Sequence, residues 1–153
     1  MELDWAGGNV ILADGVEVAR AERSWFRERA EVQIGPELWQ FRAEGWGSGT
    51  LLADLDGTTH YAARRSGFFT STWALDLGQP LELAQSGFFS TRLALTRDGT
   101  QIGEVTRSGM FTSRPRLTIN EPLDVRAGCF VLWVAHVELN RQGDGGASAA
   151  ATG

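Results

Sequence analysis

Two carboxylates at the end of an apolar run could act together as a nucleophile and a general acid. Asp54 and Asp56 follow the apolar residues 51–53 and precede Gly57. One carboxylate that attacks phosphorus and a second that handles the leaving-group proton would suffice for phosphoryl transfer. The same acids resemble the start of a calcium loop, but no Glu follows at the spacing that would close one.

The surroundings of these acids favour a turn. The D-x-D-G-T order of residues 54–58 is similar to the strand-end signature of haloacid-dehalogenase-type phosphatases. Such an enzyme also needs a lysine and a later acidic pair for Mg²⁺, whereas all 14 basic residues of this chain are Arg. Asp-Gly supplies the positive φ angles of a tight hairpin turn, which explains Asp56-Gly57 more simply. A phosphatase that uses Asp54 and Asp56 stays as an alternative.

Three further residues are of types that could take part in catalysis or metal binding. His60 lies in an expected strand without a Cys or His at metal-ligand spacing, so we interpret it as a surface or hydrogen-bonded residue. Cys129 and His136 lie seven positions apart in the most apolar segment, where core packing is the simpler role. We therefore predict no catalytic residue, no metal site and no cofactor.

Length and composition predict one soluble domain. The chain has 153 residues, of which 42% are hydrophobic, including 6 Trp and 8 Phe. We expect a single domain over residues 1–141 and a disordered, Gly- and Ala-rich tail over 142–153. No secretory signal or transmembrane stretch is recognisable, which predicts a cytoplasmic protein. The net charge is -5, and the mildly basic middle is too sparse in Arg to predict nucleic-acid binding.

Short alternating runs joined by turn residues predict a series of antiparallel hairpins. In the second of them, Val32, Ile34, Trp39 and Phe41 should point inward. About eleven strands at near-regular spacing indicate a closed barrel or a sandwich. The expected strand pairs are 10–13 with 16–20, 30–34 with 38–42, 50–54 with 58–63, 73–76 with 81–84, and 91–96 with 101–106, followed by 116–119.

Three similar segments recur between these hairpins, at residues 66–71, 86–91 and 108–113. Each begins with Ser-Gly, continues with a hydrophobic residue and Phe, and ends with two hydroxyl residues. Gly permits a sharp bend and the aromatic fills the space beside it, so the pattern is typical of a barrel corner. A ligand-binding role for these loops is the alternative.

The last element differs from the others. Residues 127–135 carry no charge, and apolar side chains occupy every direction of a helical wheel through residue 139. A helix here must be enclosed on all sides. Asn120 or Asp124 could cap its start. The β-branched valines keep a strand open as an alternative.

The segment Glu121-Pro122-Leu123-Asp124-Val125 with the apolar stretch after it, and the hairpin over residues 98–105, resemble the tubby C-terminal-like superfamily in its scramblase and LURP-one-related branch. The resemblance covers most of residues 9–141. It implies a twelve-stranded antiparallel barrel threaded by a hydrophobic C-terminal helix. It also implies a non-enzymatic binding or scaffold module whose partner is a phosphoinositide, another anionic lipid or a protein, peripheral to a membrane.

The chain departs from those relatives because it has no Lys, no cysteine-rich stretch and no complete calcium loop. Only arginines from the middle of the chain could supply an anionic-ligand site. These are Arg64, Arg65, Arg92, Arg97, Arg107, Arg114 and Arg116. A hollow barrel that carries a small apolar ligand is a further alternative, which side chains such as Phe130, Leu132 and Trp133 would oppose by filling the lumen.

Overall fold

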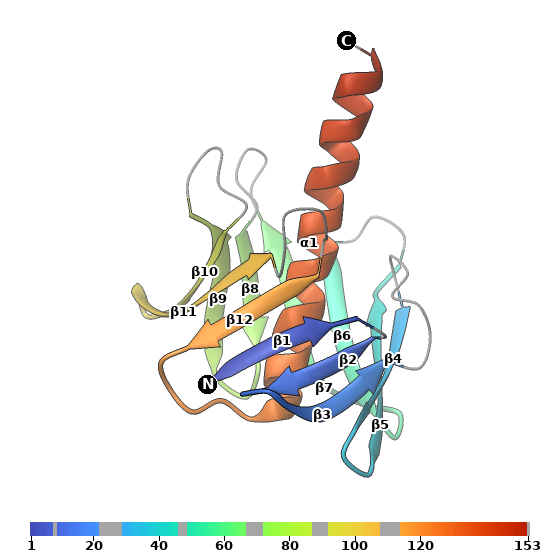
Figure 1. Cartoon of the computed structure of the whole chain (residues 1–153), viewed down its shortest axis with the longest axis vertical. Helices are drawn as coiled ribbons and strands as arrows, with labels where there is room; N and C mark the ends of the chain where they lie inside the picture. Colours follow the sequence, from blue (N-terminus) through green and yellow to red (C-terminus); the bar gives the residue numbers. More distant parts are fainter. Residues whose placement is uncertain are drawn as a thin grey trace.

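Twelve antiparallel strands close into a barrel around one long helix in the computed structural model of the chain (Figure 1). The structure describes residues 1–7, 9–21, 29–45, 49–66, 72–86, 92–107 and 114–152, with side chains described through residue 141. The elements are β1 (Glu2–Ala6), β2 (Val10–Ala13), β3 (Val16–Ala21), β4 (Arg29–Ile34), β5 (Glu37–Ala43), β6 (Thr50–Leu55), β7 (Thr58–Ser66), β8 (Thr72–Asp76), β9 (Pro80–Gln85), β10 (Leu93–Arg97), β11 (Thr100–Arg107), β12 (Pro115–Ile119) and α1 (Val125–Thr152). The predicted closed barrel is confirmed.

Neighbouring strands pair in chain order, and β1 closes the ring against β12. Each of three hairpins turns at an Asp-Gly pair in which both residues have positive φ, as two-residue hairpin turns require. The predicted hairpin pairs all form. The strand β1 was not predicted, and its closing partner β12 lies more than a hundred residues away along the chain.

Strand alternation directs apolar side chains into the barrel, as expected for a sheet with one buried face. Val32, Ile34, Trp39 and Phe41, which we predicted to face inward, are between 0% and 6% exposed. The interior is therefore lined by apolar side chains from all around the wall, and one more apolar element can be enclosed there.

That element is α1, so the strand alternative for its sequence is wrong. Asp124 is its cap, because the Asp124 Oδ1 accepts a hydrogen bond of 2.8 Å from the Arg126 backbone N–H. Phe130, Leu132 and Trp133 are at most 1% exposed, so helix side chains fill the lumen along this stretch. The predicted enclosed helix is confirmed.

The helix runs through the barrel from one end to the other. Its first turn contacts the starts of β5 and β1, since Arg126 Nε lies 2.8 Å from Glu37 Oε1 and a Cβ on Gly128 would lie 2.3 Å from Leu3 Cδ1. Further along, Glu138 meets β7 and β8 near the opposite ends of the wall. We call the end where α1 begins the base and the end where α1 leaves the rim (Figure 1).

Beyond the rim, α1 continues as a helix to Thr152 and projects from the barrel (Figure 1). This segment includes residues 142–152 of the Gly- and Ala-rich tail. A helix nucleated inside the barrel can propagate outward, because each further residue adds one backbone hydrogen bond. Among the described residues, no helix combines the length and the hydropathy needed to cross a bilayer.

The three Ser-Gly-aromatic segments connect β7 to β8, β9 to β10 and β11 to β12. Apart from Ser66 and Ser86 they lie outside the described residues. The strand ends that flank them all belong to the rim.

Candidate ligand site at the barrel rim

A buried carboxylate lies inside the barrel close to the rim. Glu138 is 1% exposed and, with His136, is one of two buried polar residues in the described part of the chain. Trp73 Nε1 of β8 donates a hydrogen bond of 3.0 Å to Glu138 Oε1, and Arg65 Nε of β7 donates one of 3.2 Å to the same oxygen. Because a buried charge is destabilising unless it is paired and hydrogen-bonded, these donors make the burial of Glu138 tolerable.

The partners of Glu138 reach from the core to the rim surface. The Trp73 side chain is fully buried, whereas the Arg65 side chain is 33% exposed. The Arg141 guanidinium lies over the Trp73 ring, 5.9 Å from its centroid, in a cation–π arrangement. Two arginines thus flank one buried indole and one buried carboxylate where the helix leaves the barrel.

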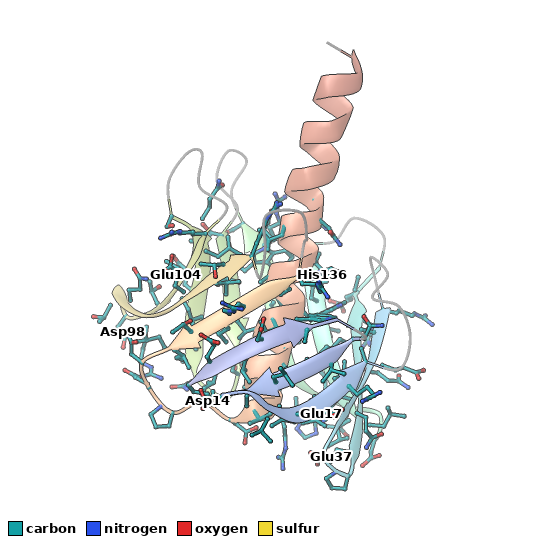
Figure 2. All side chains as sticks on the ribbon, in the orientation of Figure 1. Asp14, Glu17, Glu37, Asp98, Glu104 and His136 are labelled. Atoms are coloured by element: carbon teal, nitrogen blue, oxygen red, sulfur yellow. The ribbon has the colours of Figure 1, made fainter. Side chains whose placement is uncertain are left out.

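His136 of α1 lies against β1, inside the wall (Figure 2). Its ring lies 5.2 Å from the Trp5 ring, and its Nε2 lies 3.1 Å from Asn140 Nδ2. A ring packed on an indole and joined to the next helical turn is typical of a structural histidine. The core role predicted for His136 agrees with this position.

Arg107 belongs to the inner face of the rim. In the β11–β12 pair, Val105 lies opposite Leu117 and both are fully buried, and Arg107 lies opposite the buried Pro115 two residues further on. The period of two along a strand therefore places Arg107 on the inner face. Its Nε is buried and has no hydrogen-bond partner in the described structure. A buried donor in this state favours an anionic partner, and the Nε atoms of Arg97 and Arg116 are buried without a hydrogen-bond partner as well.

Arg114 comes directly before β12, at the rim. Its Nη1 is 3.1 Å from the position that a Cβ on Gly7 would occupy, so Arg114 reaches across to the end of β1. A side chain on Gly7 would press against this guanidinium. The absence of a side chain at Gly7 therefore leaves room for the Arg114 guanidinium at the rim.

Two more of the predicted arginines lie on the outer wall below the rim. Arg92 Nη1 is 3.4 Å from Glu104 Oε1, and Arg116 Nη2 is 3.3 Å from Asp4 Oδ2. The hydrogen bond from Arg116 to Asp4 raises the pKa of the Arg116 guanidinium. Both ion pairs join neighbouring strands on the outer, solvent-facing side of the wall.

The last two predicted arginines, Arg64 and Arg97, do not join the inward-facing arginines of the rim. Arg97 is at the base, where its guanidinium binds Glu121 just before the helix. Arg64 lies on the outer wall of β7, beside an open groove of about 390 Å³. That groove is lined by Ala62, Arg64, Ala74, Leu75, Asp76, Gly78, Gln79 and Pro80. The structure thus places six of the seven predicted arginines toward the rim end of the barrel: Arg64, Arg65, Arg92, Arg107, Arg114 and Arg116.

Charge is distributed unequally between the two ends of the barrel. Turns and strand starts at the base carry acids, including Asp14, Glu37, Asp56, Asp98 and Asp124. Figure 2 labels Asp14, Glu17 and Glu37 near the end where α1 begins. Arg97 and Arg126 lie at the base too, each paired with an acid, whereas the other arginines named above and Arg141 lie toward the rim, so the rim is more basic than the base.

Asp54 and Asp56, the candidate phosphatase residues, are placed differently from one another. Asp56 is in the hairpin turn with φ 52°, and Asp54 is on the outer wall. Asp54 Oδ2 accepts a hydrogen bond of 2.7 Å from Arg42 Nε, and Asp54 Oδ1 accepts one of 2.6 Å from the Thr59 hydroxyl. Partial burial alone would raise the pKa of Asp54, but the bonds from Arg42 and Thr59 outweigh it and lower the pKa. Both carboxylate oxygens of Asp54 therefore accept hydrogen bonds that stabilise the strand pairs around it.

The other residues considered for chemistry also have structural positions. His60 is exposed, with its ring edge against Trp39 at 5.3 Å between centroids. Cys129 is fully buried inside the barrel, and desolvation raises the pKa of its thiol to about 12. A thiol that holds its proton at neutral pH is a poor nucleophile. Among the described residues, no group of three or more His, Cys, Asp or Glu is arranged to hold a metal ion.

Sequence reasoning missed Glu138 and Trp73. The only signal was a single acid that follows a long uncharged run, in a helix expected to be enclosed on all sides. Such an acid must find donors inside the barrel, and the tryptophan indole and an arginine are the groups able to provide them.

No protein-family model, no curated protein and no solved structure matches this chain.

Proposed function

We propose that this chain is a non-enzymatic binding module of the tubby and scramblase-like type, and that it takes an anionic lipid head group at the rim of its barrel. The cytoplasm, at the surface of a membrane, is the proposed place of action. A protein partner at the same surface is the other occupant that the sequence resemblance implies.

The gathering of arginines at one end of the barrel is the observation that carries this proposal. Arg65 and Arg107 face inward there, and Arg107 has a buried Nε without a partner. Arg114 lies at the rim where β1 ends, and Arg141 adds a cation from the helix. Arginine donates several N–H groups in a planar fork that matches phosphate oxygens.

The opposite polarity of the two ends also favours docking through the rim. With a net charge of -5, the chain as a whole is repelled by an anionic surface. The acidic base and the basic rim give it an electric dipole, which would turn the rim toward such a surface. Arg92 and Arg116 on the outer wall would then lie within reach of neighbouring lipid head groups.

Vesicle flotation tests the proposal directly. Wild-type protein is expected to float with phosphatidylcholine vesicles that contain phosphatidylinositol 4,5-bisphosphate, and not with pure phosphatidylcholine vesicles. Each rim arginine contributes about 1 kcal/mol at an anionic surface. The double variant Arg107→Gln, Arg114→Gln is therefore expected to bind roughly thirtyfold more weakly. A titration with soluble inositol trisphosphate separates recognition of the head group from general attraction to the surface.

Arg97→Gln is the matched control, because it removes one arginine of the predicted set from the base. It is expected to change vesicle affinity less than about twofold, since it lies beyond the screening length of the docked surface. Absence of wild-type binding even at low ionic strength would refute the proposed function. So would a loss in Arg97→Gln as large as the loss in the rim variant.

A further inference from the structure

The buried carboxylate of Glu138 already forms an ion pair with one of the rim arginines, Arg65. Its Oε1 accepts the Arg65 Nε–H at 3.2 Å from inside the barrel. An anionic ligand at the rim would approach the same guanidinium from outside, where the Arg65 side chain is 33% exposed. The Glu138 carboxylate and the proposed ligand would therefore bind the same guanidinium.

Glu138 is fixed in a way that Arg65 is not. The carboxylate is 1% exposed, accepts a second hydrogen bond from the buried Trp73 indole, and belongs to a helix enclosed by the wall. Arg65 is the last residue but one of β7, and its long side chain is at the rim. When an outer anion attracts Arg65, Glu138 cannot follow it outward. The ligand has to separate the two charges or share the guanidinium between two anions.

Either outcome lowers the affinity of the rim for its ligand. Separation leaves a buried carboxylate with a weaker set of donors, which is unfavourable. Sharing brings two negative groups close together in a region where water screens them poorly. Arg141 does not remove this effect, because it lies over the Trp73 ring.

We propose that Glu138 is a built-in competitor for Arg65, which keeps the rim in a low-affinity state until an anionic ligand displaces it. This inference rests on the proposed function and adds its regulation. It differs from two other roles for Glu138. A carboxylate that only orients Arg65 for the ligand would raise the affinity, and one that only anchors the helix would not change it.

The test is the isosteric variant Glu138→Gln, whose amide oxygen can still accept the Trp73 N–H. In flotation with phosphatidylinositol 4,5-bisphosphate vesicles, and in titration with soluble inositol trisphosphate, this variant is expected to bind roughly three- to tenfold more tightly than wild type. Glu37→Gln is the control, because it changes the net charge equally but removes a partner of Arg126 at the base. It is expected to bind within about twofold of wild type.

Equal or weaker binding by Glu138→Gln than by wild type would overturn the competition while leaving the proposed function intact. No binding by wild type or by either variant would instead refute the proposed function.

A second measurement does not depend on the folding of the Glu138→Gln variant. In wild type, the indole N–H resonance of Trp73, assigned with Trp73→Phe, is expected to shift as inositol trisphosphate saturates the rim. Saturation without such a shift would contradict displacement of Glu138.

Discussion

Replacement of Trp133 by alanine is expected to lower the free energy of unfolding by about 3–5 kcal/mol, the largest single-residue effect we predict. Trp133 is 1% exposed and lies in the middle of the enclosed part of α1. Its ring packs on Phe41 of the wall at 5.6 Å and near Phe130 of the helix at 6.2 Å, measured between ring centroids. The barrel wall is a continuous hydrogen-bonded ring, so it cannot collapse into the space that the indole leaves.

Chemical denaturation, followed by far-ultraviolet circular dichroism, measures this loss. A domain of ordinary stability has about 5–15 kcal/mol to lose, so the variant should unfold at a much lower denaturant concentration. Leu38→Ala is the control, because Leu38 is 41% exposed on β5. It should change the free energy of unfolding by less than about 1 kcal/mol. A Trp133→Ala variant as stable as the control would mean that the lumen is not packed around the helix.

The second large effect is expected at Gly103 of β11. A Cβ at this position would lie 2.7 Å from the Thr118 carbonyl oxygen and 3.3 Å from Ile119 Cα, both on the backbone of β12. Gly103 pairs directly with Ile119, so neither strand can move without breaking ladder hydrogen bonds. Gly103→Ala should therefore lower the free energy of unfolding by about 2–3 kcal/mol.

The same denaturation experiment checks this prediction against Gln101→Ala. Gln101 is an exposed residue of the same strand, and its truncation should cost less than about 0.5 kcal/mol. If Gly103→Ala were as stable as Gln101→Ala, the close approach of β11 and β12 would be refuted. That approach matters for the rim, because the same strand pair positions Arg107 and Arg116.

Most of the barrel could be predicted from local signals. Asp-Gly turns and alternating apolar residues act over a few positions, so the hairpins and the inward direction of Trp39 and Phe41 follow from the sequence. The strand β1 could not be found in this way. It pairs with β12 across the closure of the barrel, and nothing near residues 2–6 marks that distant partner.

The candidate site was only partly readable from the sequence. Charge counting found the central arginines, but the direction of each depends on strand parity and on bulges such as the one between Leu95 and Thr96. Neighbouring arginines can therefore separate, as Arg64 on the outer face and Arg65 on the inner face of β7 do. The Glu138 contacts join residues 65 to 73 positions apart, a separation that no local pattern reports.

The fold and the proposed function depend on the same feature, because α1 both fills the barrel and carries Glu138 to the rim. Hydrogen exchange of the backbone amides of residues 129–139 tests that feature most directly. If the wall encloses the helix, these amides should exchange only through global unfolding, as slowly as the slowest strand amides. Exchange of this segment well ahead of the strands, at rates typical of an exposed helix, would contradict the enclosed helix and with it the position of Glu138 beside Arg65.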